Sequence, residues 1–568
     1  MATGLSNLLI AAPVVLSCGM IGGTSIYAQV ETDGTVGPRL QLDGPEFAIR
    51  ADLGARAGRN LFHSFERFSL GTGERATFTG PNQIRNVLSR VTGGERSDID
   101  GTLGSTIPGA DFFFINPAGV TFGPNATLDV QGSFHVSTAD ELRFSDGAKF
   151  SATNPGASSL TIAAPEAFGF LGADHAAITV NQSTLEVPRG EAFSIVGGDI
   201  TIDGGNNGVI SGGDDGLVRA AAGTIHLLAL DGPGAARIDE GEAAAGPTGA
   251  SIALDLALVD ASGDGGGTVR VRGGNFVVDR SLIDASNFGD RPGHGSIDVR
   301  LVGDLTLSQS LIGAGSSGSG SGGTVEIAAA NITLSEGLLN SNSLLGAGNA
   351  GSVTVTADRL TLLEGSQISS STGQGSTGAG GEVQVTARES LLIAGRNARD
   401  GPSGIFASTE GAANSDRAAG NVTVTAGDLE IRDGGQISSA TETAGDAGAV
   451  TVTVTAGDLE IRDGLITSST LTAGDAGSVT VTADRLTLLE GGIFASAEGA
   501  ANGAAGNVTV TAGTLELRDG LISSVSEGAG DAGRVLITAD DLTLRSSVIN
   551  SSSFDQGDAG SIVSRPMI

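Results

Sequence analysis

From residue 268 to the end of the chain, hydrophobic and polar residues alternate in short runs that glycine-rich segments separate. In the unit that opens at Ser352, residues 353–357 (VTVTA) place an apolar side chain at every second position, and residues 360–362 (LTL) repeat the alternation. A third run begins at Ile368. A period of two is typical of a β-strand with one buried face. Each unit therefore predicts three short strands.

The whole unit recurs along the chain. Successive copies open 27 to 30 residues apart, except for one longer interval over residues 382–420, whose extra residues predict a loop on one face. Between the runs lie turn signals, such as the Gly-Asp-Ala-Gly segments at residues 445–448, 474–477, 530–533 and 557–560. The copies open at Thr268, Ser296, Thr324, Ser352, Glu382, Asn421, Ala449, Ser478, Asn507, Arg534 and Ser561.

Three strands per unit at a constant phase predict an all-β fold, a right-handed parallel β-helix in which each unit is one coil. One coil alone buries too little apolar surface to be stable, so the coils must stack. Equivalent apolar positions should then form interior lines. We expect one line through Val353, Val481, Val510 and Ile537, and another through Leu362, Leu488, Leu517 and Leu544.

The chain before residue 268 has a different composition. Fifteen of the 20 phenylalanines lie there, including residues 112–114 and the trio Phe62, Phe65 and Phe68. We interpret this enrichment as a hydrophobic plug at the open end of the solenoid, because an uncovered terminal coil would offer unpaired backbone groups to other chains. The alternative is that some of these side chains contact a transporter during export.

Several strings of this region occur in a set order: residues 60–70 (NLFHSFERFSL), 90–94 (RVTGG) and 112–134 (FFFINPAGVTFGPNATLDVQGSF). In order and wording they resemble the N-terminal domain of filamentous haemagglutinins, the substrates of bacterial two-partner secretion, in the versions carried by repeat-rich cyanobacterial exoproteins. The resemblance covers roughly residues 29–230. It implies a secretion domain that caps the solenoid.

The most diagnostic string of that family is Asn-Pro-Asn-Gly followed by Ile or Leu. Here it reads Asn116, Pro117, Ala118, Gly119 and Val120, so alanine replaces the second asparagine. Proline presets φ and glycine adopts backbone conformations that other residues resist, which predicts a tight turn. The resemblance also implies secretion recognition by Asn116, Pro117, Gly119 and Val120. The implied partner is an outer-membrane pore with periplasmic polypeptide-transport-associated domains, which would pair with strands of the unfolded chain.

The expected organisation is a signal peptide over residues 1–28, a secretion domain over 29–265 and β-helix repeats over 266–568. Residues 5–28 are apolar, rich in small residues and followed by a polar stretch. A lipoprotein cleavage box at residues 15–18 is the alternative. With the signal peptide removed, the mature chain loses its only cysteine, Cys18, and no disulfide can form. The repeat stops in mid-phrase at residues 561–563, which indicates a longer natural protein.

The formal net charge of -33 argues against nucleic-acid partners and against anionic membrane surfaces. We also expect no stable membrane insertion. Neutral glycans, cationic surfaces or divalent ions fit that charge better. Lys149 is the only lysine, so phosphate-binding loops of the Walker type and Schiff-base chemistry have almost no place in the chain.

Candidate chemical residues are scattered or repetitive. The histidines, His63, His135, His175, His226 and His294, lack metal-ligand spacing, and we expect surface or turn positions for them. The carboxylates of Asp358, Asp428, Asp458, Asp484 and Asp540 recur at one turn, which is typical of a solvated corner. Calcium takes six to eight oxygen ligands, and the Gly-Asp-Ala-Gly corners offer one carboxylate per coil. We therefore expect no metal, cofactor or catalytic site.

Together these features predict a non-enzymatic exoprotein that is secreted or held at the cell surface after crossing the periplasm and outer membrane. It would act as an adhesin or a structural rod, with surface glycans or cells as further partners. The alternative is a β-helical polysaccharide lyase or hydrolase. That alternative requires an outer groove in which two carboxylates and a basic group meet across adjacent coils.

Overall fold

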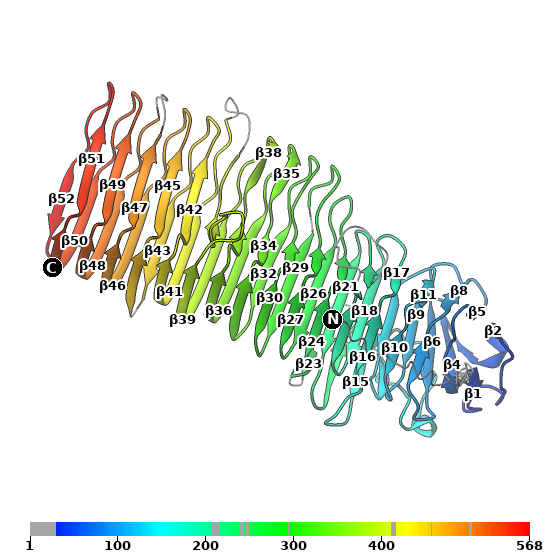
Figure 1. Cartoon of the computed structure of the whole chain (residues 1–568). Coiled ribbons are helices and arrows are strands. Elements are labelled where there is room, and N and C mark those ends of the chain that lie inside the picture. The colour runs from blue at the N-terminus through cyan, green and yellow to red at the C-terminus, as the bar shows by residue number, and fades with distance from the viewer. Residues whose placement is uncertain are drawn as a thin grey trace, which may run out of the picture.

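The computed structural model describes residues 30–205, 216–238, 243–245, 249–293, 295–410, 416–455, 457–498 and 503–567. The expected signal peptide with Cys18, and His294, lie outside the described residues. The described chain forms a parallel β-helix of about 17 turns (Figure 1), so the predicted all-β fold is confirmed. Its described helical elements are two 3-10 turns, η1 (Ala51–Leu53) and η2 (Pro155–Ala157). No helix in this part of the chain is long and apolar enough to cross a membrane.

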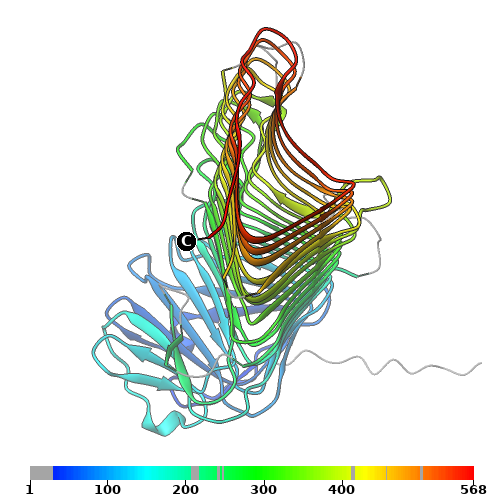
Figure 2. The ribbon, with the colours of Figure 1, turned by 90° about the vertical axis from the view of Figure 1, so that its left-hand side faces the viewer.

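Each coil has three faces, and strands on the same face pair in parallel from coil to coil. Viewed along the axis, successive coils lie over one another on nearly the same outline (Figure 2). The strands of the first face are β4 (Asn60–Phe68), β6 (Asn86–Val91), β9 (Asp111–Ile115), β12 (Phe134–Ser137), β18 (Ala192–Gly197), β21 (Thr224–Ala229), β26 (Thr268–Gly273), β29 (Ser296–Leu301), β32 (Thr324–Ala328), β43 (Val450–Val454) and β52 (Ile562–Arg565).

The second and third faces follow in each coil. The second-face strands are β7 (Ser97–Ile99), β10 (Val120–Phe122), β16 (Ile178–Asn181), β19 (Ile200–Asp203), β24 (Ile252–Asp255), β27 (Phe276–Asp279), β30 (Leu305–Ser308), β33 (Asn331–Ser335) and β44 (Asp458–Arg462). The third-face strands are β2 (Glu46–Arg50), β5 (Arg75–Thr79), β8 (Thr102–Ser105), β11 (Thr127–Asp129), β17 (Thr184–Glu186), β20 (Leu217–Arg219), β25 (Leu258–Asp260), β28 (Leu282–Asp284), β31 (Leu311–Gly313), β34 (Leu338–Asn340), β37 (Gln367–Ser369), β40 (Gly404–Phe406), β42 (Gln436–Thr441), β45 (Leu465–Thr470), β47 (Gly492–Ala497), β49 (Leu521–Ser526) and β51 (Val548–Ser553).

In most later coils the first two predicted strands are one long, bent strand. These strands are β36 (Ser352–Leu363), β39 (Val383–Ala394), β41 (Val422–Arg432), β46 (Val479–Leu489), β48 (Val508–Arg518) and β50 (Val535–Arg545). Earlier coils break at this corner beside a glycine, such as Gly274, where a Cβ would lie 2.0 Å from the carbonyl oxygen of Gly249. The later coils carry Ala-Asp, Ala-Arg or Ala-Gly there, and the strand continues around the bend in all of them except the coil of β43 and β44. An additional short pair, β35 (Ser343–Gly346) and β38 (Thr372–Ser376), extends two coils.

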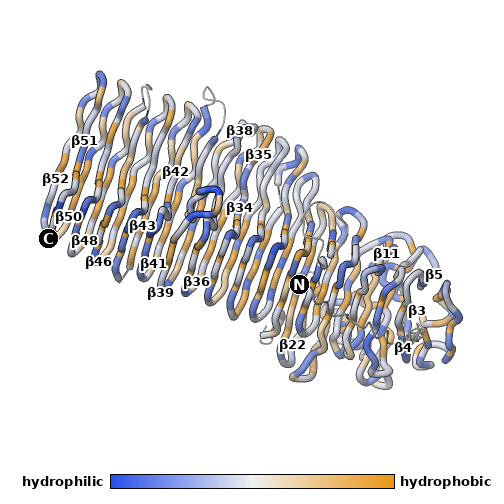
Figure 3. Tube along the Cα trace, in the orientation of Figure 1, coloured by the Kyte–Doolittle hydropathy of each residue, from blue (hydrophilic) through white to orange (hydrophobic). Residues whose placement is uncertain are grey.

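The interior lines follow the predicted alternation, with one error of phase. Leu362 joins the line that reaches Leu488, Leu517 and Leu544, as predicted. Val353 does not join Val481 and Val510; its line reaches Val479 and Val508, and Val355 occupies the predicted place. A shift of two residues keeps every side chain on the same side of the strand, so burial gives no sign of it. The alternation is visible as changing hydropathy along the strands (Figure 3).

The Gly-Asp-Ala-Gly corners are close-packed from coil to coil. A Cβ on Gly477 would lie 2.2 Å from the carbonyl oxygen of Gly448. In the equivalent Gly-Ala-Ala-Gly corner, a Cβ on Gly506 would lie 2.0 Å from the carbonyl oxygen of Gly477. Buried serines of the third face donate hydrogen bonds to these corners. The Ser468 hydroxyl donates to the Gly448 carbonyl at 2.9 Å, and the Ser524 hydroxyl donates to the Gly506 carbonyl at 2.8 Å. The second glycine of this corner is therefore required by steric contact.

Two inserted segments build a separate antiparallel sheet, called the extra-helical sheet here. Its strands are β13 (Glu141–Phe144), β14 (Lys149–Ser151), β15 (Pro165–Phe170), β22 (Gly234–Arg237) and β23 (Ala243–Ala245). It lies beside the early coils (Figure 2) and packs on the outer side of their first face.

The phenylalanines divide between two cores, which corrects the expected single plug. In residues 112–114, the side chains of Phe112 and Phe114 fill the interior of the coils, whereas Phe113 points outward into the core under the extra-helical sheet. The edge of the first coil is covered differently, because β1 (Val30–Thr32) and β3 (Ala55–Ala57) pair antiparallel with β4. Backbone pairing, and not aromatic packing alone, thus caps the solenoid.

Candidate functional site

The turn at Asn116 joins β9 on the first face to β10 on the second. The Gly119 N–H donates to the Asn116 carbonyl at 3.0 Å, which closes a four-residue turn with Pro117 at its second position. Gly119 has φ 110°, a conformation that favours glycine. A Cβ there would also lie 3.2 Å from the carbonyl oxygen of Ala177 in the next coil. The backbone geometry of the turn thus explains why proline stands at position 117 and glycine at position 119.

Asn116 holds three coils together through its side chain and its backbone N–H. Its Nδ2 donates to the Glu95 carbonyl and to Ser97 Oγ in the preceding coil, both at 2.9 Å. Its Oδ1 accepts the Ala118 N–H at 2.9 Å, and its own backbone N–H donates to the Ser137 carbonyl of the following coil at 2.9 Å. Asn116 is 1% exposed. Because every polar group of this side chain is used internally, its hydrogen-bonding groups cannot serve a partner in the folded domain.

Val120 is inaccessible for a second reason. It is 0% exposed and belongs to the interior core, where its strand lies between Ser97 of the preceding coil and Ile178 of the next. Pro117 is half-buried. The four residues of the family motif therefore form one turn, in which all but the half-buried Pro117 are buried.

Arg90, in the string RVTGG, is a large buried side chain for which the sequence suggested no role. Its Nε donates to Ser64 Oγ at 2.8 Å, its Nη1 to the Ser151 carbonyl at 2.5 Å and its Nη2 to Thr35 Oγ1 at 2.9 Å. The guanidinium carbon lies 4.0 Å from the centre of the Phe150 ring. Burial lowers the pKa of Arg90 to about 10, with Asp33 acting in the opposite direction. Arg90 joins the N-terminal segment, the first face and the extra-helical sheet.

Asp33 lies beside Arg90 and joins the same hydrogen-bond network, called the Asp33 joint here. Its carboxylate accepts hydrogen bonds from Ser64 Oγ at 2.6 Å, from Thr92 Oγ1 at 2.8 Å and from the Thr35 N–H at 2.8 Å. Burial by itself would raise the pKa of Asp33, but these hydrogen bonds outweigh it and the pKa lies below its usual value. Thr92 belongs to the same string as Arg90, so this part of the resemblance has a structural cause.

Asn60, the first residue of the string at 60–70, anchors the extra-helical segment. Its Nδ2 donates to the carbonyl oxygens of Thr161 at 2.9 Å and Ala163 at 2.7 Å, and its Oδ1 accepts from Asn86 Nδ2 at 2.7 Å. Asn60 is 1% exposed. The block that resembles a secretion address is therefore also the scaffold that holds the two layers together.

Three histidines contradict the surface or turn positions expected of them. His63, His135 and His226 are buried, and burial lowers the pKa of His63 to about 4, of His135 to about 3 and of His226 to about 4. His63 is packed against the Phe65 and Phe78 rings, while His135 and His226 point outward from the first face. His175 is half-buried in the loop between β15 and β16, with its Nε2 2.8 Å from the Gly232 carbonyl. Period-two patterns do not reveal that another sheet covers the outer side of a strand.

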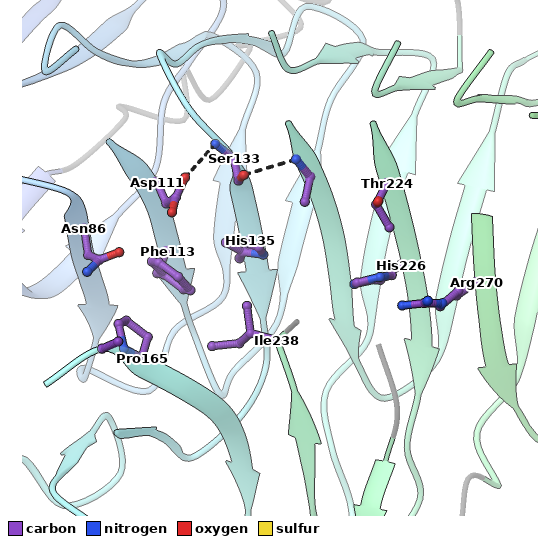
Figure 4. Close-up of a pocket in the computed structure, with 12 residues that line it drawn as sticks. Asn86, Asp111, Phe113, Ser133, His135, Pro165, Thr224, His226, Ile238 and Arg270 are labelled. Carbon is purple, nitrogen blue, oxygen red and sulfur yellow. Dashed lines mark hydrogen bonds between the residues drawn. The ribbon is translucent and has the colours of Figure 1, made fainter. Parts of the chain in front are cut away.

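The outward-facing column of side chains that contains His135 and His226 changes from apolar to polar along the axis of the β-helix. It runs from Leu88 and Phe113 through His135, Ser194 and His226 to Arg270, Asp298 and Glu326, and then to threonines such as Thr354. The apolar members lie under the extra-helical sheet. The polar members begin where a cavity of about 530 Å³ opens between the two layers (Figure 4).

Residues 28–290 match the family model described as the TPS secretion domain. These residues are a two-partner secretion domain. The chain is accordingly an exoprotein of a two-partner secretion system, and such a domain implies a cognate outer-membrane transporter. Among solved structures, the HMW1 secretion domain from Haemophilus influenzae matches at a TM-score of 0.33 with 16% identity, over 94% of this chain and 98% of that chain. No curated protein matches the chain.

The secretion domain and the repeats are continuous in structure. The matched range extends past residue 265, and β26 pairs with β21 before it and β29 after it in unbroken register. The first face therefore offers one surface across both parts. No interruption of the coils marks the expected boundary.

One outward site gathers two carboxylates with basic groups across adjacent coils. The Asp298 carboxylate lies 2.6 Å from Arg272 Nη2 and 3.1 Å from Arg300 Nε, and Arg300 Nη2 lies 3.9 Å from Glu326. The hollow beside them is about 100 Å³ and reaches Thr354. Both carboxylates are engaged by guanidinium groups. The cluster has the residue types expected of a polysaccharide-active site, namely two carboxylates and a basic group on adjacent coils. Its carboxylates and guanidinium groups, however, form ion pairs with one another.

The recurring aspartates of the repeats lie at exposed or half-buried corners. Asp358 forms an ion pair with Arg388 at 3.0 Å, and Asp428 accepts the N–H of Asp458 at 3.0 Å. In the Gly-Asp-Ala-Gly corners, Asp446 accepts the N–H of Asp475 at 2.9 Å. The Asp428 and Asp446 carboxylates thus bind the backbone of the next coil. Within the described ranges, no group of three or more His, Cys, Asp or Glu side chains is placed to hold a metal ion.

Proposed function

We propose that the secretion domain is the export address of this exoprotein and that a cognate outer-membrane pore reads it through periplasmic polypeptide-transport-associated domains. The observation that carries this proposal is the family match over residues 28–290, which contains all the strings that sequence analysis singled out. The repeats would follow as a rod that displays an adhesive or structural surface outside the cell.

We further propose that the pore reads the Asn116 turn before the domain folds. In the folded domain Asn116 and Val120 are 1% and 0% exposed, so a partner cannot reach them. In the unfolded chain, residues 112–120 are an uncharged, strand-forming segment that can add to the sheet edge of a periplasmic domain. Recognition and folding then compete for the same residues.

Folding outside the cell would begin at the secretion domain. Its first coil is capped by antiparallel strands, whereas the opposite side of each coil pairs with the coil that follows. Each coil that folds therefore offers a row of backbone groups on which the next can form. That order is possible if the N-terminal part of the chain leaves the pore first.

The export proposal is tested with two shortened proteins in strains with and without the pore. Residues 1–290 end between β28 and β29, at the close of a coil. We expect this protein to reach the culture medium only when the pore is present. A protein in which residues 1–28 are joined directly to residue 296 should stay in the periplasm in both strains. Secretion of the second protein through the pore would contradict the proposal.

A second candidate function is polysaccharide cleavage, for which the Asp298, Glu326 and Arg300 cluster is the specific observation. We favour the adhesin or rod, because both carboxylates are held in ion pairs and the adjoining hollow is about 100 Å³. The purified protein should release no new reducing or unsaturated ends from a panel of bacterial and plant polysaccharides. Release that Asp298→Asn and Glu326→Gln abolish would establish the enzyme instead.

A further inference from the structure

The cavity between the first face and the extra-helical sheet is lined by hydrogen-bonding groups of both kinds. Asp111 accepts, Arg270 donates, and Asn86 and Thr224 can do both. Among the lining residues that the structure describes, one charged side chain is acidic, Asp111, and one is basic, Arg270. Its volume of about 530 Å³ lies in the range of pockets that hold small molecules.

The remaining wall is apolar and comes from both layers. Phe113 lies on β9, and its ring stacks on His135 with 4.5 Å between centroids. Pro165 opens β15, and Ile238 directly follows β22 of the extra-helical sheet. Figure 4 shows Phe113 and His135 on neighbouring strands, with Pro165 and Ile238 across from them. A ligand here would contact polar groups along one side and carbon along the other.

The two buried histidines of the cavity are coupled through Ser194. Its hydroxyl lies 2.9 Å from His135 Nδ1 and 3.5 Å from His226 Nδ1. A hydroxyl has one proton, so with both contacts made it donates to one ring and accepts an N–H from the other. The two neutral rings then have opposite tautomers: one Nε2 carries a hydrogen and the other an unshared pair. His226 Nε2 is buried and has no hydrogen-bond partner among the described residues.

We propose that this cavity binds a neutral sugar residue of a glycan. Each sugar hydroxyl both donates and accepts, so adjacent hydroxyls match the donor and acceptor of the histidine pair. The carbon face of the sugar would pack on the Phe113 and Ile238 side. An anionic ligand would face Asp111 and a cationic one Arg270. The inference deepens the proposed adhesin role, on which it rests for its biological meaning, by naming the ligand class and the site.

The test uses the purified, folded mature chain and needs no pore. Galactose, glucose, mannose, fucose and N-acetylglucosamine are titrated separately, with galacturonate and glucosamine as charged comparators, and binding is followed by saturation-transfer NMR and calorimetry. We expect at least one neutral sugar to bind saturably. His226→Phe, which keeps a planar aromatic ring but removes both nitrogens, should weaken that binding at least about tenfold.

A second variant blocks the cavity without touching its buried groups. Ala164 is exposed at the rim, so Ala164→Trp should occlude the opening, leave the melting temperature unchanged and also weaken binding at least about tenfold. The control is Thr354→Val, in the same outward column but several coils beyond the cavity. No binding by any neutral sugar, binding of the charged sugars only, or binding that both cavity variants retain would overturn the proposal. Failure of export in the pore assay would instead count against the secretion role alone.

Discussion

Replacement of Gly119 by valine tests whether the Asn116 turn links folding to export. Gly119 has φ 110°, where a residue with a side chain is strained by about 1–3 kcal/mol. The new Cβ would lie 3.2 Å from the Ala177 carbonyl oxygen and 3.5 Å from the Ala176 Cβ, and valine adds two methyl groups beyond it. Strain and crowding together should lower the free energy of unfolding of the secretion domain by about 2–4 kcal/mol.

The measurement is urea unfolding of the purified domain, followed by far-UV circular dichroism, together with secretion of the full chain in a strain that carries the pore. The matched control is Gly156→Val. Gly156 lies in η2, and a Cβ there would meet no atom within 4 Å. The control should change stability by about 0.5 kcal/mol or less and leave secretion intact.

Two results would refute the reasoning. If Gly119→Val unfolds at the same urea concentration as the unchanged domain, then the backbone of this turn does not require glycine. If the domain is destabilised but the chain is secreted at the normal level, then neither folding nor the motif limits export, and the Asn116 turn is only an architectural element.

Three further predictions follow from the packing. Arg90→Met should destabilise the secretion domain by about 3 kcal/mol or more in urea, because it leaves the Asp33 joint without its guanidinium, whereas the exposed Arg85→Met should have little effect. Gly477→Ala should cost about 1–3 kcal/mol in thermal or urea unfolding of the repeats, since its Cβ would lie 2.2 Å from the Gly448 carbonyl oxygen; unchanged stability would show that the corner can widen. Burial lowers the pKa of His63 to about 4, so the unfolded chain, with a pKa near 6.5, binds more protons between these values and stability falls as the pH drops. From about pH 7.5 to about pH 5 this histidine should account for about 2 kcal/mol, which His63→Phe should remove from the measured pH dependence.

The alternation of apolar and polar residues was enough to predict the repeat architecture. One coil per unit, three faces and interior lines such as that of Leu362 follow from the period of two and the spacing of the turns, because these are local properties that every copy repeats. The register of Val353 with the later coils could not be predicted in this way, because a shift of two residues leaves the same side of the strand buried. The strings at residues 60–70, 90–94 and 112–134 sufficed to indicate the secretion domain.

Only the tertiary structure decided what covers the outer side of the coils. Phe113, His135 and His226 occupy positions that face outward in a period-two pattern. They are buried because the segments inserted after β12 and after β21 fold back over the first face as the extra-helical sheet. Arg90 likewise has polar partners on three segments distant in sequence. The physical reason is that strand periodicity specifies which side of a strand a residue takes, whereas the burial of that side depends on contacts that no local pattern encodes.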